Sequence, residues 1–69
     1  MPHVHITMYP GRSDEIKKDL AIKVQKLLAD ELHIDHKVIS VSIEDIPKEQ
    51  WAETYAKIPS ETIYIKPTL

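Results

Sequence analysis

The sequence contains no cysteine, and this absence excludes disulfide bridges and thiolate metal sites. A chain of 69 residues predicts one small domain over residues 1–69, which buries only about 60% of the surface that its unfolded form exposes. Below about 70–80 residues a lone core gives little stability, so small folds usually carry disulfides, a metal or partner chains. Because covalent bridges are excluded, we expect self-association to stabilise this fold.

Basic and aromatic residues are also scarce. The formal net charge is −2, Arg12 is the only arginine, and the aromatic side chains are one Trp and three Tyr. A surface that follows nucleic-acid phosphates needs a basic stripe with aromatic platforms, so no nucleic-acid partner is expected.

Long apolar runs are missing as well. No run approaches the roughly 20 residues of a membrane-spanning helix, so no membrane partner is expected. The opening Met-Pro-His lacks the basic and apolar regions of a signal peptide. We therefore expect a cytoplasmic protein.

The first part of the chain predicts a strand followed by a helix. Residues 3–9 alternate between polar and apolar side chains, which is typical of a half-buried strand, and Pro10-Gly11 marks a turn after it. Ser13 is then a suitable N-cap for a helix from Asp14 to about Leu32. The predicted packing stripe of this helix consists of Ile16, Leu20, Val24, Leu27 and Leu28.

Ile22 lies off that stripe. Two interpretations stay open: a scattered surface isoleucine, or a contact with another subunit.

A second strand is predicted over residues 38–44, where apolar and polar residues alternate again. Strand, helix and strand make a parallel β-α-β unit. A turn or short helix is expected over residues 48–51, and a short strand over residues 62–65. The expected fold class is α+β, with two parallel strands and one long helix. Two strands leave open edges and a semi-polar outer face, so a second subunit is expected to complete the sheet.

Two motifs make the chain similar to a known family. Pro2 directly after Met1, and the run Gly11-Arg12-Ser13-Asp14-Glu15 at the strand-to-helix turn, resemble the 4-oxalocrotonate tautomerase family. The likeness covers about the first 51 residues. The opening Met-Pro-His and the part past Trp51 resemble the bacterial branch that acts on phenylenolpyruvate. The resemblance implies a tautomerase-like β-α-β subunit assembled as a dimer or hexamer, with an amino-terminal proline as catalytic base.

The chemistry of an amino-terminal proline also supports Pro2 as a catalytic base. Removal of Met1 would leave Pro2 with a free secondary amine, and an apolar pocket or a nearby cation such as Arg12 would lower the pKa of that amine towards neutrality. The amine could then take a proton from an enol hydroxyl or a carbon next to a carbonyl and return it elsewhere, without a cofactor. The alternative is a proline that serves only amino-terminal processing.

Three further residues are predicted to bind the substrate. Arg12 offers a planar fork for a carboxylate beside a helix N-terminus, with a solvated surface charge as the alternative. By resemblance, Trp51 takes the place of an apolar wall, although a core or interface tryptophan is the alternative. Ser40 stands where many members of the family carry a second arginine that polarises the substrate carbonyl. This departure favours a monocarboxylate such as an aryl or alkyl enolpyruvate.

The histidines give weaker indications. His3, next to Pro2, is a candidate hydrogen-bond donor at the site. A zinc site built from His3, His5, His33 and His36 is considered, but no diagnostic ligand spacing supports it, and neither a metal nor another cofactor is expected.

These observations predict a cofactor-independent keto–enol tautomerase that acts on a small 2-oxo or enol carboxylate. Two alternatives stay open: a non-enzymatic oligomerising module of the same fold, and a proline-dependent hydratase or dehalogenase.

Overall fold

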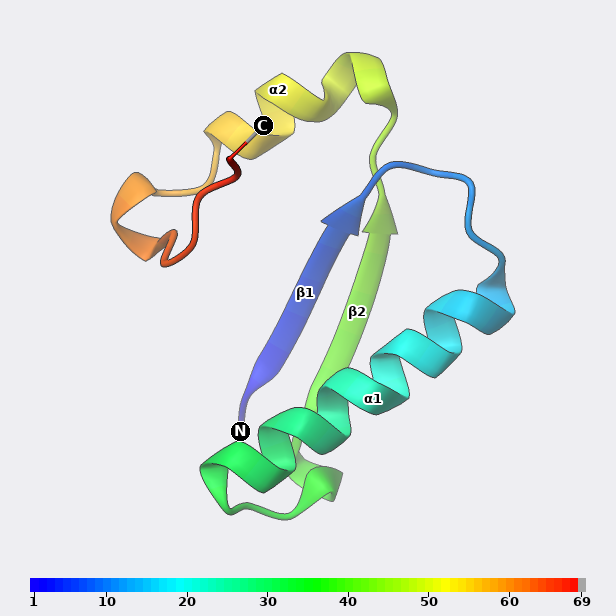
Figure 1. The fold of residues 1–69 in the computed structure, drawn as a ribbon, viewed down its shortest axis with the longest axis vertical. Helices are drawn as coiled ribbons and strands as arrows, with labels where there is room; N and C mark the ends of the chain where they lie inside the picture. The colour runs from blue at the N-terminus through cyan, green and yellow to red at the C-terminus, as the bar shows by residue number, and fades with distance from the viewer. Residues whose placement is uncertain (69) are drawn as a thin grey trace.

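The computed structural model describes residues 1–68 and forms a parallel β-α-β unit with a C-terminal extension (Figure 1). Strand β1 spans His3–Met8, helix α1 Asp14–Leu32 and strand β2 Ser40–Asp45. A short helix, α2, follows over Trp51–Ala56. Three 3₁₀ turns lie at His36–Val38, Lys48–Gln50 and Ser60–Thr62. The predicted α+β class, with two parallel strands and one long helix, is confirmed.

Helix α1 begins where the sequence predicted. The side chain of Ser13 accepts a hydrogen bond from the backbone N–H of Ile16 at 3.2 Å, and Asp14 and Glu15 occupy the first turn, where negative charge is favourable. The helix is capped by His33, whose N–H bonds the carbonyl of Ala29 and whose left-handed backbone (φ 55°) lets the N–H of Ile34 bond the same carbonyl at 3.2 Å.

Strands β1 and β2 pair with His3 opposite Ser40 and Met8 opposite Asp45. This register gives the sheet two unlike faces, because neighbouring residues of a strand point to opposite sides. One face carries Val4, Ile6 and Met8 with Val41, Ile43 and Asp45, and the other carries His3, His5 and Thr7 with Ser40, Ser42 and Glu44. The separation of apolar and semi-polar faces predicted from the alternation is confirmed.

The predicted packing stripe of α1 was partly wrong. Ile16 and Leu27 are 56% and 57% exposed, whereas Leu20, Val24 and Leu28 are half-buried. At 100° per residue, Ile16 and Leu27 lie on one flank of the half-buried face, and Ile22, also 56% exposed, lies on the other flank. Both flanks of the helix therefore carry apolar side chains that the single chain does not cover.

Residue Gln25, which the apolar pattern passed over, lies on the half-buried face. Its side-chain amide donates to the carbonyl oxygens of His36 at 2.8 Å and Ile39 at 3.0 Å. These bonds fasten the connection before β2 to the helix. The second strand begins at Ser40, two residues later than predicted, because the side chain of Asp35 caps a 3₁₀ turn there by accepting from the N–H of Lys37.

The predicted strand over residues 62–65 was wrong. Residues Ser60–Thr62 form a 3₁₀ turn, and no strand follows among the residues described up to Thr68. The backbone N–H and the hydroxyl of Thr62 both donate to the carbonyl of Pro59, at 2.9 and 2.7 Å. Local hydrogen bonds thus replace strand pairing. The turn and short helix expected over residues 48–51 are confirmed by the 3₁₀ turn at Lys48–Gln50 and by α2.

The chain buries little surface for its size. Within residues 1–68, Ile39 and Ile46 form the buried core, each 4% exposed. The accessible surface is 5901 Å², whereas a folded monomer of 8.0 kDa exposes roughly 4,400–4,500 Å². The radius of gyration is 13.5 Å, against about 11 Å for a compact domain of this length.

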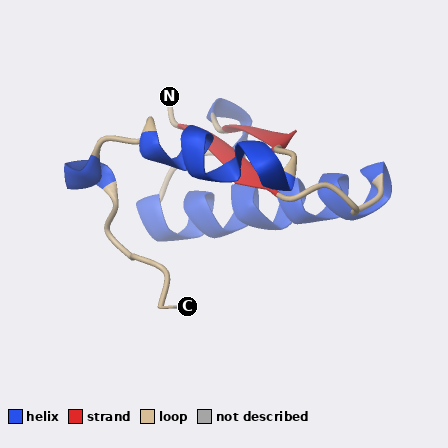
Figure 2. Cartoon of the chain, turned by 90° about the horizontal axis from the view of Figure 1, so that it is seen from above, coloured by secondary structure: helices blue, strands red, loops and turns tan. Residues whose placement is uncertain are grey.

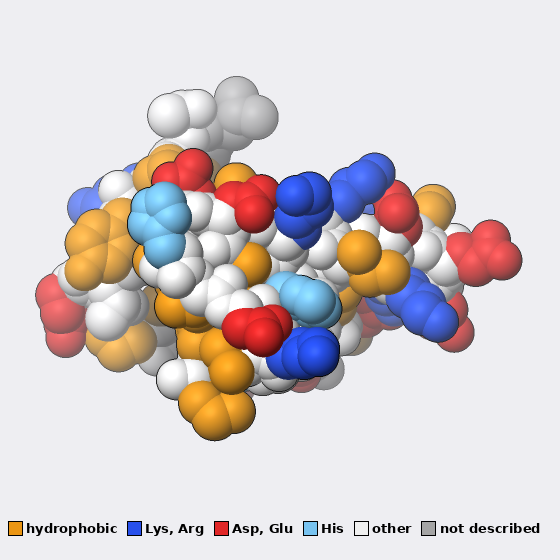
Figure 3. Space-filling model, turned by 90° about the horizontal axis from the view of Figure 1, so that it is seen from below, with side chains coloured by type: hydrophobic (Ala, Val, Ile, Leu, Met, Phe, Trp, Pro, Cys, Tyr) orange, Lys and Arg blue, Asp and Glu red, His pale blue; other side chains and the backbone are white. Residues whose placement is uncertain are grey.

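The extra surface includes apolar side chains. Figure 3 shows hydrophobic side chains at the surface between charged ones. Seen from above, the chain after α2 runs away from the sheet (Figure 2), and there Tyr64 is 95% and Ile65 89% exposed. No helix in the described part of the chain is both long and apolar enough to cross a membrane.

Candidate active site

The turn between β1 and α1 places Arg12 beside the helix N-terminus. Gly11 adopts a positive φ of 128°, a conformation that L-residues rarely take, and so turns the chain sharply into the Ser13 cap. Arg12 is exposed, and its Nη1 donates to the carbonyl of Tyr9 at 3.4 Å. The rest of its planar fork remains available for an anion next to the positive end of the α1 dipole.

Trp51 lies close to Arg12. A hollow of about 350 Å³ is lined by Thr7, Met8, Tyr9, Arg12 and Trp51. The rings of Tyr9 and Trp51 meet edge to face, with centroids 5.2 Å apart and planes at 85°, and Tyr55 stacks on Trp51 with a centroid distance of 6.4 Å. The structure thus combines a cationic fork with an aromatic wall, as a small carboxylate with an apolar body would require.

Pro2 and Ser40 lie together at the other end of the strands. The backbone N–H of Ser40 donates to the carbonyl of Pro2 at 3.2 Å, and His3 stands opposite Ser40 in the register. Pro2 is half-buried, and Met1, attached to its nitrogen, is 99% exposed. While Met1 remains, that nitrogen is an amide and has no basic lone pair.

The predicted site residues therefore fall into two groups. Seven residue steps separate Pro2 from Tyr9, which in an extended strand is about 23 Å. Figure 1 shows the same separation, with the N-terminus at the start of β1 and α2 beyond its far end. One chain brings Arg12 and Trp51 together, and Pro2 and Ser40 together, but it does not join the two groups.

His3 makes two hydrogen bonds across the strands. Its Nδ1 lies 2.6 Å from Ser40 Oγ, and its Nε2 lies 2.9 Å from Ser42 Oγ. The alternation of the sequence predicted that these side chains share one face of the sheet, but it did not predict hydrogen bonds between them. The two histidine pairs do not form a metal site either, since residues 1–68 contain no group of three or more potential His, Asp or Glu ligands.

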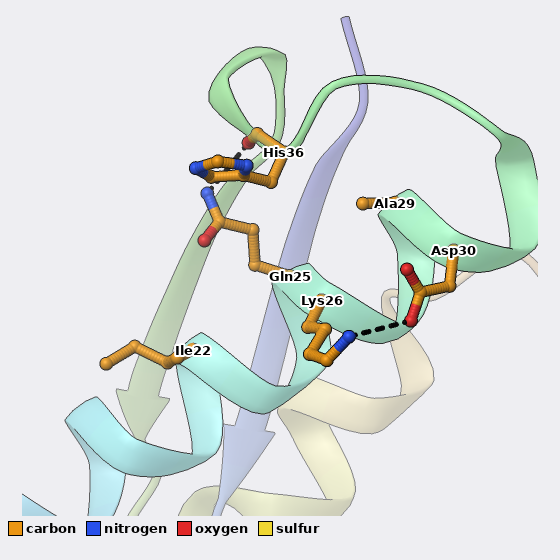
Figure 4. A pocket seen from close by; sticks show the side chains of 6 residues that line it. All are labelled: Ile22, Gln25, Lys26, Ala29, Asp30 and His36. Carbon is orange, nitrogen blue, oxygen red and sulfur yellow. Dashed lines mark hydrogen bonds and ion pairs between the residues drawn. The ribbon is translucent and has the colours of Figure 1, made fainter.

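A second hollow, of about 420 Å³, lies on the flank of α1 that carries Ile22, next to His36 of the following 3₁₀ turn (Figure 4). In the close-up, Lys26 pairs with Asp30 at 3.1 Å, and Gln25 reaches back to His36. Exposed Ile22 borders this hollow. None of the predicted site residues lines it.

One ionisable group outside these regions has a clearly shifted pKa. The carboxylate of Asp19 accepts a hydrogen bond from Lys23, one helical turn later, and raises the pKa of Lys23. Both side chains are solvent-exposed, so this pair belongs to the surface of α1 and not to either end of the sheet.

Comparison with known proteins identifies the family. A family model described as tautomerase enzyme matches residues 2–54. The chain belongs to the tautomerase family. The matched residues contain both ends described above, from Pro2 through Arg12 and Ser40 to Trp51.

Two relatives support this assignment. A protein of Xylella fastidiosa named "Probable tautomerase" is 34% identical over 53 residues, 77% of this chain and 65% of that protein. The "2-hydroxymuconate tautomerase" of Comamonas testosteroni is 39% identical over 51 residues, 74% of this chain and 81% of that protein. The match thus spans just under two thirds of the Xylella protein. The predicted resemblance to the tautomerase family is confirmed.

Proposed function

We propose that the protein is a cofactor-independent keto–enol tautomerase acting on a small 2-oxo or enol carboxylate. The observation that carries the proposal is the hollow that combines Arg12 with Trp51 in a chain of the tautomerase family. Arg12 would hold the substrate carboxylate, and Trp51 would pack against its apolar part.

Pro2 would move the proton. Once Met1 is removed, the secondary amine of Pro2 takes the proton of the enol hydroxyl while the carbon–oxygen double bond forms. The protonated amine of Pro2 then returns the proton to the carbon next to the new carbonyl. The electrons of the former carbon–carbon double bond form the new carbon–hydrogen bond there. The number of atoms and electrons is unchanged, so the reaction needs no redox partner.

The separation of the two groups implies a site shared between copies. Backbone N–H groups of Ser40 and Ile46 donate to Pro2 and Met8, so the even-numbered residues of β1 direct their backbone groups to β2. The odd-numbered residues then face the open edge of β1. A two-fold axis normal to the sheet would pair two such edges antiparallel, bringing Pro2 of one copy towards Arg12 and Trp51 of the other.

The surface of the single chain supports such pairing. It exposes about 1,400 Å² more than a folded monomer of its mass, and a standard interface buries about 800 Å² per partner. The exposed Ile16, Ile22 and Leu27 on the flanks of α1 provide further apolar surface for a dimer or a hexamer.

Ser40 bears on the substrate class. It is neutral and lies beside Pro2, so in the assembled site Arg12 is the nearby fixed cation. One cation matches one carboxylate, which favours an aryl or alkyl enolpyruvate over a dicarboxylate.

The test is the ketonisation of phenylenolpyruvate, followed by ultraviolet absorbance, with protein shown by mass spectrometry to lack Met1. Wild type should be faster than Pro2→Ala and Arg12→Ala, with all three equally folded by circular dichroism. Equal slow rates for wild type and Pro2→Ala would refute the proposal and favour a non-enzymatic module. Hydration or dehalogenation without ketonisation would indicate the alternative proline chemistry.

A further inference from the structure

Five side chains on the face of the sheet away from α1 form one continuous row of hydrogen bonds. We call this row the polar ladder; in order it consists of Ser40, His3, Ser42, His5 and Glu44. Besides the two bonds of His3, the Nδ1 of His5 lies 2.5 Å from Ser42 Oγ, and its Nε2 lies 3.0 Å from Glu44 Oε1. Each histidine of β1 thus bridges two successive outer residues of β2.

The carboxylate at one end fixes the direction of the whole row. An ionised carboxylate only accepts, so Nε2 of His5 must donate to Glu44. A neutral imidazole with a proton on Nε2 accepts at Nδ1, so the hydroxyl of Ser42 must donate to His5.

The same reasoning continues to the other end. The oxygen of Ser42, its proton being engaged, accepts from Nε2 of His3. The Nδ1 of neutral His3 then accepts from the hydroxyl of Ser40. In the neutral ladder every proton points towards Glu44, and the Ser40 oxygen offers only its lone pairs to a neighbour.

One added proton changes what Ser40 offers. If every hydrogen bond of the ladder is kept, donor and acceptor exchange roles in each bond that lies between the newly protonated group and Ser40. This holds for any group of the ladder that takes up the proton. Nδ1 of His3 then donates to the Ser40 oxygen, and the Ser40 hydroxyl is free to donate outwards. A second proton is disfavoured, because two imidazolium rings would both bond the oxygen of Ser42.

We propose that the polar ladder is a proton-operated switch that makes Ser40 a hydrogen-bond donor to the substrate carbonyl oxygen beside Pro2. The 3.2 Å bond between the Ser40 N–H and the Pro2 carbonyl makes the two residues neighbours at the start of the strands. The inference rests on the proposed function. It makes the neutral Ser40 a donor, and when the added proton is on His3 the imidazolium charge lies one hydrogen bond from Ser40.

One charged side chain, that of Glu44, belongs to the ladder itself. Glu44 supplies a negative charge at the end of the row, whereas Asp45 lies on the other face, where it pairs with Lys17 of α1 at 2.6 Å. The amine of Pro2, once free, is the remaining ionisable group at the start of β1, and its protonation opposes that of His3. Histidine is the side chain that gains and loses a proton near physiological pH, so the test of the switch compares pH values on either side of neutrality.

The direction of the ladder can be measured without substrate. Nitrogen-15 NMR of the imidazole rings should find both His3 and His5 protonated on Nε2 at about pH 8. Glu44→Gln removes the charge that fixes the direction, so Nδ1-protonated forms should appear, while Glu53→Gln on exposed α2 is the matched control. An Nδ1-protonated form of either histidine in wild type would overturn the inference.

The effect on the reaction is read from a ratio. The kcat/KM of wild type divided by that of Ser40→Ala should rise about tenfold from about pH 8 to about pH 5.5, the value of one charge-assisted hydrogen bond. Ser40→Ala keeps Pro2, so the ionisation of Pro2 enters the kcat/KM of both proteins. Ser40→Thr, which keeps the hydroxyl, should restore the pH-dependent gain.

The two hypotheses fail in different ways. A ratio that does not change with pH, in an enzyme that needs Pro2, would refute the switch and leave the tautomerase proposal standing. Equal rates for wild type and Pro2→Ala would refute the tautomerase proposal, and with it the action of Ser40 on a substrate, whatever the NMR spectra show.

Discussion

The two ends of the β1–β2 sheet differ in chemistry. At the start of the strands, Pro2 and Ser40 lie among small and neutral polar groups joined by hydrogen bonds. At their far end, Arg12 and two aromatic rings line an open hollow. Neither end is a complete site for a carboxylate with a reactive carbonyl, and about 23 Å of strand separates them. Under the proposed function, the two ends are halves of one site that a second copy of the chain brings together.

A mixture of two impaired variants tests most directly whether the two ends of the sheet act in one shared site. We expect Pro2→Ala to lower kcat/KM by about 10²–10⁴-fold and Arg12→Ala by about 10–100-fold. Unfolded together and refolded at equal amounts, they should regain about a quarter of the wild-type activity, because half of the dimers would be mixed and each would hold one intact site. No gain over the separate variants would mean that both halves act within one copy.

A substitution at the open edge of β1 should separate the halves. Thr7 faces that edge, so Thr7→Pro removes a backbone donor needed for antiparallel pairing and leaves the bonds to β2 in place. We expect a smaller species by light scattering and activity at least about tenfold lower at micromolar concentration. Thr7→Val keeps the N–H and is the control. A Thr7→Pro protein of unchanged size would exclude pairing through this edge.

The aromatic half can be tested alone. Trp51→Ala removes the wall beside Arg12 and should raise KM by about tenfold for an aryl substrate, the equivalent of roughly 1–2 kcal/mol of apolar contact. Trp51→Phe should lose much less. Equal KM values for wild type and Trp51→Ala would assign Trp51 to packing against Tyr9 and Tyr55.

A smaller effect concerns how the two ends are held in position. Lys17 of α1 bonds Asp45 at the end of β2 at 2.6 Å, with side chains 20% and 36% exposed. Asp45→Asn should lower the free energy of unfolding by about 1 kcal/mol in urea titrations. Asp19→Asn, at the fully exposed pair with Lys23, is the matched control and should leave the midpoint nearly unchanged.

Periodicity and capping residues predicted most of the fold. The alternation of residues 3–9 and the Ser13 cap located β1 and α1 because they are local signals. The buried face of α1 was predicted less well. Polar Gln25 is half-buried because its side chain donates hydrogen bonds to two backbone carbonyls, and a pattern of apolar residues does not reveal such bonds. The strand predicted over residues 62–65 was wrong because the turn at Pro59 competes with a strand that has no partner in this chain.

The candidate site was predictable as a set of residues but not as an arrangement. Resemblance pointed to Pro2 and Arg12, and Arg12 was expected near Pro2, but within one chain the length of β1 separates them. The pairing of Tyr9 with Trp51 depends on where α2 lies after β2, which sequence spacing does not determine. The polar ladder needs the register of β1 against β2 and the side-chain rotamers, both of which are tertiary information.

The single glycine of the chain has a consequence for substitutions at its position. An added Cβ at Gly11 would meet no atom within 4 Å, so a methyl group has room there. The obstacle is the positive φ of 128°, which disfavours L-residues and not their mirror images. At this turn the fold resists L-alanine because of its backbone conformation and not because of its size.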